Sequence, residues 1–287
     1  MKRKEFLKMG GGLALAGLAS NNAFASFMNN EEFKKIKKFG LQLYTLRDDF
    51  PKDPKGVLKQ VASFGYKQLE SFEGPNGIFW GMTNKEFKSY IGDLGMEIVS
   101  SHCDISKDFE KKAAEAAEIG MKYLICPYKG PQKSIDEFKK FADEFNQKGE
   151  ICKKNGIRFA YHNHDYSFVD MGGELGQDVM MKNTDPNLVD FELDMYWVVT
   201  AGHDIETWLK KYPNRFRLCH IKDRRKDSKE KADSCDLGTG SIDWPKILKT
   251  AQKTGMKYFI VEQERYDGTT PLKAVEADAK YMKGLSI

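Results

Sequence analysis

Two kinds of hydrophobic pattern alternate along the chain. In the first, apolar residues return every three or four positions, which predicts amphipathic helices over residues 53–64, 83–94, 108–119 and 134–155. In the second, short β-rich runs follow directly after a glycine, as in "FGYKQLESF" at Gly65 and "IGMKYLICPY" at Gly120. Glycine just past a helix is the usual left-handed cap, so each such glycine indicates a helix end, a tight turn and a strand.

The expected strands begin near residues 41, 66, 96, 121, 157, 188, 216 and 256. Eight strands that alternate with helices predict an α/β fold, a single (β/α)8 TIM barrel over residues 26–287. A doubly wound open sheet is the main alternative, but it often has a phosphate-binding loop, and the chain contains neither GxGxxG nor GxxxxGK[ST]. The charged stretch at residues 222–234 follows the seventh strand, and we expect it to form an extended, solvated loop beside the barrel mouth.

The first 25 residues differ from the rest. A basic start through Lys8, an apolar run over about residues 9–19 and the ending Ala23-Phe24-Ala25 predict a secretory signal peptide cleaved after Ala25, and therefore a periplasmic protein. The apolar run is about half of the ~20 residues that a membrane-spanning helix needs, so we expect no stable membrane anchor. "RKEFLK" also resembles the twin-arginine export motif, with Lys4 in place of the second arginine, which leaves the export route open.

Composition narrows the classes of partner. With 40% hydrophobic and 12% aromatic residues, the 287-residue chain can build a large core, which excludes disorder. The leader holds four basic residues and one acidic residue, so its removal lowers the formal charge from +4 to about +1. A nucleic-acid partner is therefore not expected. The five cysteines are widely spaced and odd in number, so no disulfide framework is expected, and the sequence leaves a homo-oligomer open.

The ends of four consecutive strands carry polar residues. Alternate residues of a strand share one side, so His162 and His164 should face the same way. At the carboxyl end of a TIM barrel, where active sites lie, four strands would gather His162 and His164, Glu192 and Asp194, His220, and Glu262 and Glu264. Such nitrogen and carboxylate donors suit Mn²⁺, Co²⁺, Fe²⁺ or Zn²⁺. Salt bridges around the barrel rim are the alternative explanation for these residues.

From Phe39 onward the chain resembles the xylose isomerase-like TIM barrels, the sugar phosphate isomerase/epimerase family. The resemblance is carried by "YHNHDYSF", "FELDMYWVVTAGHD", "HIKDRR", "GTGSIDW" and "IVEQE", which occur in this order and at the family's spacing. It implies one divalent metal ion (Mn, Co, Fe or Zn) held by His162, Asp194, His220 and Glu262. It also implies substrate contacts from Glu70, His102, Trp197, Lys222 and His164, with a sugar or keto-sugar as the small-molecule partner.

One departure bears on mechanism. The ketose epimerases of this family place glutamates at both the fifth-strand and the eighth-strand positions, whereas His162 stands at the first of these here. We expect Glu262, or one of the histidines His162 and His164, to remove a proton next to a carbonyl while the metal stabilises the enediolate. Return of the proton to another carbon makes the protein an isomerase or epimerase, our first expectation. Loss of a β-oxygen substituent makes it a lyase or dehydratase on a keto-sugar or 3-keto-glycoside, and a non-catalytic sugar-binding barrel is a further alternative.

Overall fold

The computed structural model describes residues 36 and 38–286. The predicted signal peptide, residues 1–25, lies outside the described residues. Ile36–Leu285 form one compact unit. Among the helices described, none combines the length and the apolar character that crossing a membrane requires.

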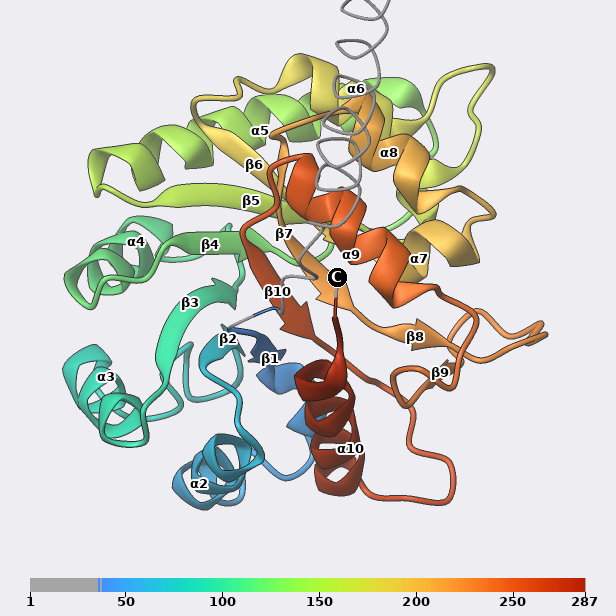
Figure 1. Cartoon of the computed structure of the whole chain (residues 1–287). Coiled ribbons are helices and arrows are strands. Elements are labelled where there is room, and N and C mark those ends of the chain that lie inside the picture. The colour runs from blue at the N-terminus through green and yellow to red at the C-terminus, as the bar shows by residue number, and fades with distance from the viewer. Residues whose placement is uncertain (1–35, 37, 287) are drawn as a thin grey trace, which may run out of the picture. The chain divides into compact units, whose positions relative to one another are not determined.

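Eight parallel strands close into a barrel in the order β1-β10-β7-β6-β5-β4-β3-β2, which confirms the predicted TIM barrel (Figure 1). Each strand begins within two residues of its predicted start. The strands are β1 Gly40–Gln42, β2 Gln68–Phe72, β3 Glu97–His102, β4 Tyr123–Cys126, β5 Arg158–His162, β6 Val189–Asp194, β7 Phe216–Ile221 and β10 Tyr258–Val261.

Helices connect the strands around the outside of the barrel (Figure 1). They are α2 Pro54–Phe64, α3 Asn84–Asp93, α4 Phe109–Glu118, α5 Ile135–Lys154, α6 Gly176–Asn183, α7 Met195–Thr200, α8 Ile205–Lys211, α9 Trp244–Lys253 and α10 Pro271–Gly284, with short 3-10 helices η1 Leu43–Leu46 and η2 Asp165–Phe168. Local sequence sets several of their starts. Thr83 and Ser134 each form a capping box with a glutamate three residues later, so the first backbone N–H groups of α3 and α5 are satisfied.

The barrel has two hydrophobic cores. The larger one lies between the sheet and the helices, and it includes Phe191 and Leu193 of β6. The residues that alternate with these on β6, Asp190, Glu192 and Asp194, belong to neither core. A small separate cluster forms an apolar floor inside the barrel and consists of Val99, Tyr123, Ile125, Ala160 and Leu218. Above this floor, toward the carboxyl ends of the strands, the interior is polar.

The charged stretch after β7 differs from the prediction. It is not one extended, solvated loop, because Asp223–Arg224 (β8) and Ser234–Cys235 (β9) pair as a two-stranded antiparallel sheet. The Asp223 carboxylate is buried and accepts hydrogen bonds from the backbone of Gly238 and Gly240 at 2.9 and 3.1 Å. The sequence pattern missed this because only the two ends of the charged stretch are buried, at residues 222–223 and 233–234, whereas the charged residues between them are mostly exposed.

Candidate active site and metal centre

Strand register brings the polar residues to a common depth. His162 pairs with Glu192 across β5 and β6, and Asp194 pairs with His220 across β6 and β7. Glu262 directly follows β10, whose last pair joins Val261 to Ile221. The side chains form two layers, an inner layer nearer the floor and an outer layer at the mouth.

The inner layer consists of Glu70, His102 and Glu192, all buried. His102 Nε2 lies 2.8 Å from Glu192 Oε2 and 3.2 Å from Glu70 Oε1. Gln42 donates to Glu70 Oε1 at 2.7 Å, and Ser100 donates to its other oxygen at 2.5 Å. Glu70 is therefore held from three sides, and it lies beneath the mouth.

His162 and His220 connect the two layers. His162 Nδ1 lies 3.1 Å from Glu192 Oε2, and its Nε2 lies 3.7 Å from Asp194 Oδ2. His220 Nε2 lies 2.7 Å from Glu70 Oε1, and its Nδ1 lies 3.0 Å from Glu262 Oε2. Each imidazole thus has one nitrogen fixed by an inner carboxylate and the other turned toward an outer one.

The outer layer consists of Asp194, Glu262 and Glu264, with Lys222 among them. The Lys222 ammonium is buried and lies 2.8 Å from Asp194 Oδ2, 2.8 Å from Glu262 Oε2 and 2.6 Å from Glu264 Oε1. Asp194 Oδ1 caps α7 by accepting from the backbone N–H groups of Tyr196 and Trp197 at 2.9 and 3.2 Å. Its other oxygen, Oδ2, is buried, and its partner is the Lys222 ammonium.

Electrostatics keep Asp194 and Glu262 ionised. Burial alone would raise the pKa of Asp194, but the charges of Lys222 and His220 outweigh it and hold that pKa below its usual value. Burial would also raise the pKa of Glu262, but the charges of Lys222 and His220 outweigh it and hold that pKa below its usual value. In the inner layer, burial and the charge of Glu70 raise the pKa of Glu192 to about 7.

The donors fit a divalent cation. One atom each from Asp194, His220 and Glu262 lie within 4.8 Å of one another, and His162 reaches the same oxygen of Asp194. A histidine that binds a metal usually gives its second nitrogen to a carboxylate, and both histidines have that arrangement here. Buried Asp194 Oδ2 has its ion pair with Lys222 but no hydrogen bond of regular geometry, so an ion would be a further partner for it. A bound ion would take over the charge compensation that Lys222 now provides.

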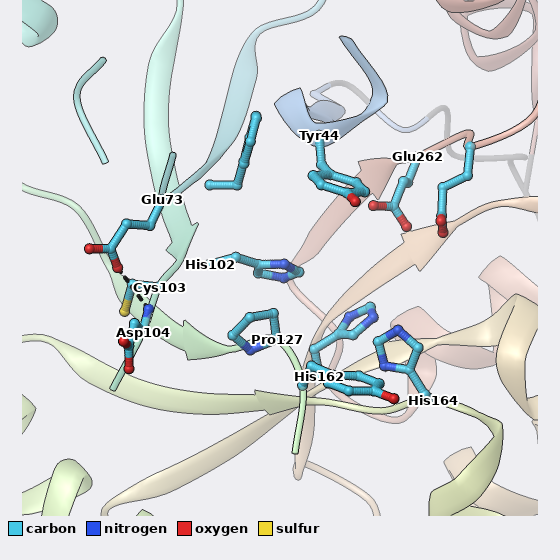
Figure 2. A pocket seen from close by; sticks show the side chains of 12 residues that line it. Tyr44, Glu73, His102, Cys103, Asp104, Pro127, His162, His164 and Glu262 are labelled. Carbon is cyan, nitrogen blue, oxygen red and sulfur yellow. Dashed lines mark hydrogen bonds between the residues drawn. The ribbon is translucent and has the colours of Figure 1, made fainter. Parts of the chain in front are cut away.

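A cavity of about 400 Å³ opens beside this cluster (Figure 2). Figure 2 shows His102, His162, His164 and Glu262 pointing into it. His164 Nδ1 is buried without a hydrogen-bond partner. Burial and the charge of Lys222 lower the His164 pKa to about 4, so its imidazole is neutral at pH 7. The remaining lining residues are Tyr44, Phe72, Glu73, Cys103, Asp104, Pro127, Tyr128 and Glu264.

The sequence-predicted residues fall into two groups. Of the expected ligands, Asp194, His220 and Glu262 converge, whereas His162 groups with His102, Glu192 and His220 and lies 3.7 Å from Asp194 Oδ2. His102 and His164 line the cavity. Glu70, Trp197 and Lys222, which were expected to contact substrate, do not line it. Glu70 lies under His220, whereas Trp197 and Lys222 border a smaller neighbouring pocket.

Sequence reasoning gave no role to several residues of the site. Glu192 was placed on the same face as Asp194, but its contacts with His102 and His162 are visible only in the structure. Tyr44 and Tyr128 follow the first and fourth strands, where a TIM barrel places its substrate loops, and that position was the available signal.

Comparison with known proteins gives a consistent result. Residues 58–285 match the family described as xylose isomerase-like TIM barrel. An inosose dehydratase of Clostridium perfringens is 31% identical over 164 residues, which span 52% of this chain and 54% of that relative. The chain therefore aligns with about half the length of that curated relative.

Solved structures agree on the fold. A sugar phosphate isomerase/epimerase of Parabacteroides distasonis is 32% identical, with a TM-score of 0.73 over 86% of this chain and 94% of that one. An IolI protein with a bound zinc atom is 16% identical, with a TM-score of 0.70 over 86% of this chain and 96% of that one. At that identity the second likeness concerns the fold alone.

Proposed function

The chain belongs to the xylose isomerase-like TIM barrel family, and we propose that it is a divalent-metal-dependent lyase that removes water or a β-oxygen substituent from a keto-sugar. Its named relatives are enzymes that act on sugars or related compounds, and those named dehydratases favour the lyase over the isomerase or epimerase that we expected first. The observation that carries the proposal is the convergence of Asp194, His220 and Glu262 within 4.8 Å beside a cavity.

Each residue of the site has a distinct role in the proposed reaction. An ion held by His162, Asp194, His220 and Glu262 would polarise the substrate carbonyl and acidify the adjacent C–H. Glu262 is ionised, and its Oε2 meets His220 and Lys222, which leaves Oε1 to take that proton. The electron pair of the broken C–H bond then forms the new double bond as the β-oxygen departs. The proton that Glu262 takes would pass to the departing oxygen, so that it leaves as water or an alcohol, and neutral His164, which faces the cavity, would donate an N–H hydrogen bond to that oxygen.

The fifth-strand position separates the proposed lyase from an epimerase. An epimerase that works with two carboxylates needs one on each face of the substrate carbon, and His162 takes one of these places. His162 Nδ1 is already fixed by Glu192 at 3.1 Å, so its remaining nitrogen is better suited to a cation than to proton transfer. A single carboxylate base is sufficient for elimination.

NMR of the full chain with a 3-keto-glucoside in D₂O tests the proposal. A lyase yields an enone and free water or aglycone, whereas an isomerase yields deuterium incorporation with neither released. Glu262→Gln should lower the rate by about 10²–10⁴, because its amide cannot accept the proton. Glu264→Gln is the matched control, and its loss should be much smaller. A sugar-binding barrel without catalysis would show no turnover and no stoichiometric metal in any variant.

Export remains part of the proposal. A signal peptide at residues 1–25 would place the enzyme in the periplasm, where unphosphorylated sugars are the available substrates. N-terminal sequencing of the protein from cell fractions tests this. A periplasmic chain that begins at Ser26 supports export, and a cytoplasmic chain that retains its leader contradicts it.

A further inference from the structure

The large cavity changes character from its inner end to its outer end. At the inner end lie His102, His162, His164 and Glu262, which the proposed function assigns to the keto-sugar. Phe72 pairs with His102 in the barrel and Pro127 directly follows β4, so both lie near the same depth, whereas Tyr44 and Tyr128 stand beyond the strand ends and border the outer end. A volume of about 400 Å³ falls in the range of about 300–1,000 Å³ that accommodates ligands larger than one sugar ring.

Two tyrosines at the outer end are unusually exposed. Within residues 38–286, the exposed large hydrophobic side chains are Tyr44 at 40%, Tyr128 at 56% and Val169 at 55%. Two of these three border the cavity. Single exposed apolar residues are ordinary, but two rings at one cavity mouth form a surface that binding would cover.

Both rings are held in place although they are exposed. Tyr44 meets Phe72 edge to face with centroids 5.2 Å apart, and the Arg47 guanidinium lies 4.9 Å from the Tyr44 ring centre. Tyr128 meets His164 at 5.0 Å and Tyr166 at 5.3 Å, both nearly perpendicular. A ligand would therefore find rings that are already ordered, and it would lose little entropy in fixing them.

The two rings approach the cavity from different walls. Tyr44 lies in η1, directly after β1, and Tyr128 follows β4. Around the closed barrel, β2 and β3 separate β1 from β4, so the tyrosines stand three strands apart. A ring that extends outward from the inner end would pass between them.

Charge indicates what kind of ligand fits. No Lys or Arg is among the described residues that line this cavity, but four acidic residues are: Glu73, Asp104, Glu262 and Glu264. Lys112 pairs with Glu73 at 2.7 Å, and Lys222, which lies outside the lining, pairs with Glu262 and Glu264 at 2.8 and 2.6 Å. Because the carboxylates already engage these lysines, a phosphate or carboxylate group at the outer end would find no free lysine or arginine in the lining, so the outer end favours an uncharged ligand.

We propose that Tyr44 and Tyr128 form an aromatic subsite for an uncharged ring attached to the keto-sugar, so that the substrate is a keto-glycoside and not a free monosaccharide or a sugar phosphate. The ring is an aryl aglycone or a second sugar, because both present an apolar face to a tyrosine. The inference rests on the proposed function for what lies at the inner end, but ring binding can be measured without turnover.

Calorimetric titration of the full chain tests the subsite with phenyl β-D-glucoside, cellobiose and methyl β-D-glucoside. The phenyl glucoside or cellobiose should bind about ten-fold more tightly than the methyl glucoside, and the tighter of the two identifies the ring. Tyr44→Leu and Tyr128→Leu should each lower that ratio about three- to five-fold, whereas Tyr44→Phe should keep it. Val169→Ala removes the third exposed side chain, which does not line the cavity, and it should change nothing.

Three results would overturn the subsite: equal affinity for all three glycosides, an unchanged ratio in both leucine variants, or tighter binding of glucose 6-phosphate than of methyl glucoside. Turnover separates its failure from that of the proposed function. Equal kcat/KM for a free keto-sugar and for its phenyl glycoside removes the subsite and leaves the lyase standing. Tight, tyrosine-dependent phenyl glucoside binding without any enone product leaves the subsite standing and removes the lyase.

Discussion

Replacing Lys222 with methionine removes a positive charge from the centre of the outer layer. The Lys222 ammonium is 1% exposed and lies within 2.8 Å of Asp194, Glu262 and Glu264. Methionine has nearly the same length and no charge, so the change isolates the ion pairs. In metal-free protein, Asp194 and Glu262 would then keep only the positive charge of His220, at 3.8 and 3.0 Å.

The expected loss of stability is large. Removing one partner of a buried ion pair costs about 3–5 kcal/mol, because the other charge stays buried without compensation. The remaining contacts with His220 place the loss near the lower end, about 3 kcal/mol. For a domain of this size that loss lowers the Tm by about 6–12 °C. A divalent ion among the same carboxylates restores the missing charge, so with saturating Mn²⁺ or Zn²⁺ the loss should fall below about 3 °C.

Thermal unfolding followed by circular dichroism, once with EDTA and once with the metal ion, measures both losses. Lys112→Met is the matched control, because Lys112 is also buried and pairs with Glu73 at 2.7 Å, away from the proposed ligands. Its Tm should fall by the same amount with and without metal. If the Lys222→Met loss is equally independent of metal, the ion does not bind among these carboxylates and the reasoning fails.

Four further predictions follow. Burial raises the pKa of Asp278 well above its usual value. An acid whose pKa is higher in the folded state than in the unfolded state lowers the free energy of unfolding increasingly as the pH rises above about 4. The Tm gain of Asp278→Asn should therefore be larger at pH 8 than at pH 5, and a gain independent of pH would contradict this. In α5, a Cβ at Gly149 would lie 2.8 Å from Leu188 Cβ, so Gly149→Ala should lose about 1–3 kcal/mol in urea unfolding. In α3, no atom lies within 4 Å of a Cβ at Gly92, so Gly92→Ala should gain about 0.5–1 kcal/mol in the same assay, and a loss there would show that the helix geometry is wrong. Finally, His162→Ala should reduce bound metal well below one equivalent by elemental analysis, and full retention would remove His162 from the ligand set.

The fold was predictable because its signals are periodic and local. The apolar stripes of the helices, and glycines such as Gly65 and Gly120 with positive φ at helix ends, recur along the chain. Once a parallel barrel is expected, the carboxyl ends of all its strands must lie at the same end. Residues as distant in sequence as His162 and Glu262 could therefore be assigned to that end. No long-range contact had to be known for these assignments.

Details of the site were less predictable, since they depend on how irregular segments fold after each strand. Lys222 follows β7 by one residue, and the sequence alone was compatible with a solvated charge at the rim. Its burial results from three carboxylates, and Glu264 is contributed by the segment after another strand. Tyr44 and Tyr128 were missed for the same reason, because no pattern distinguishes an exposed tyrosine at a cavity from one elsewhere.

The apolar floor of Val99, Tyr123, Ile125, Ala160 and Leu218 closes the barrel below the polar layers. The site is consequently open to solvent at one end of the barrel, so a ligand enters and leaves past the same rim. Product must leave through this opening before the next substrate enters. Changes in the segments around Tyr44 and Tyr128 would therefore alter the rate of product release without changing any residue at the reacting end.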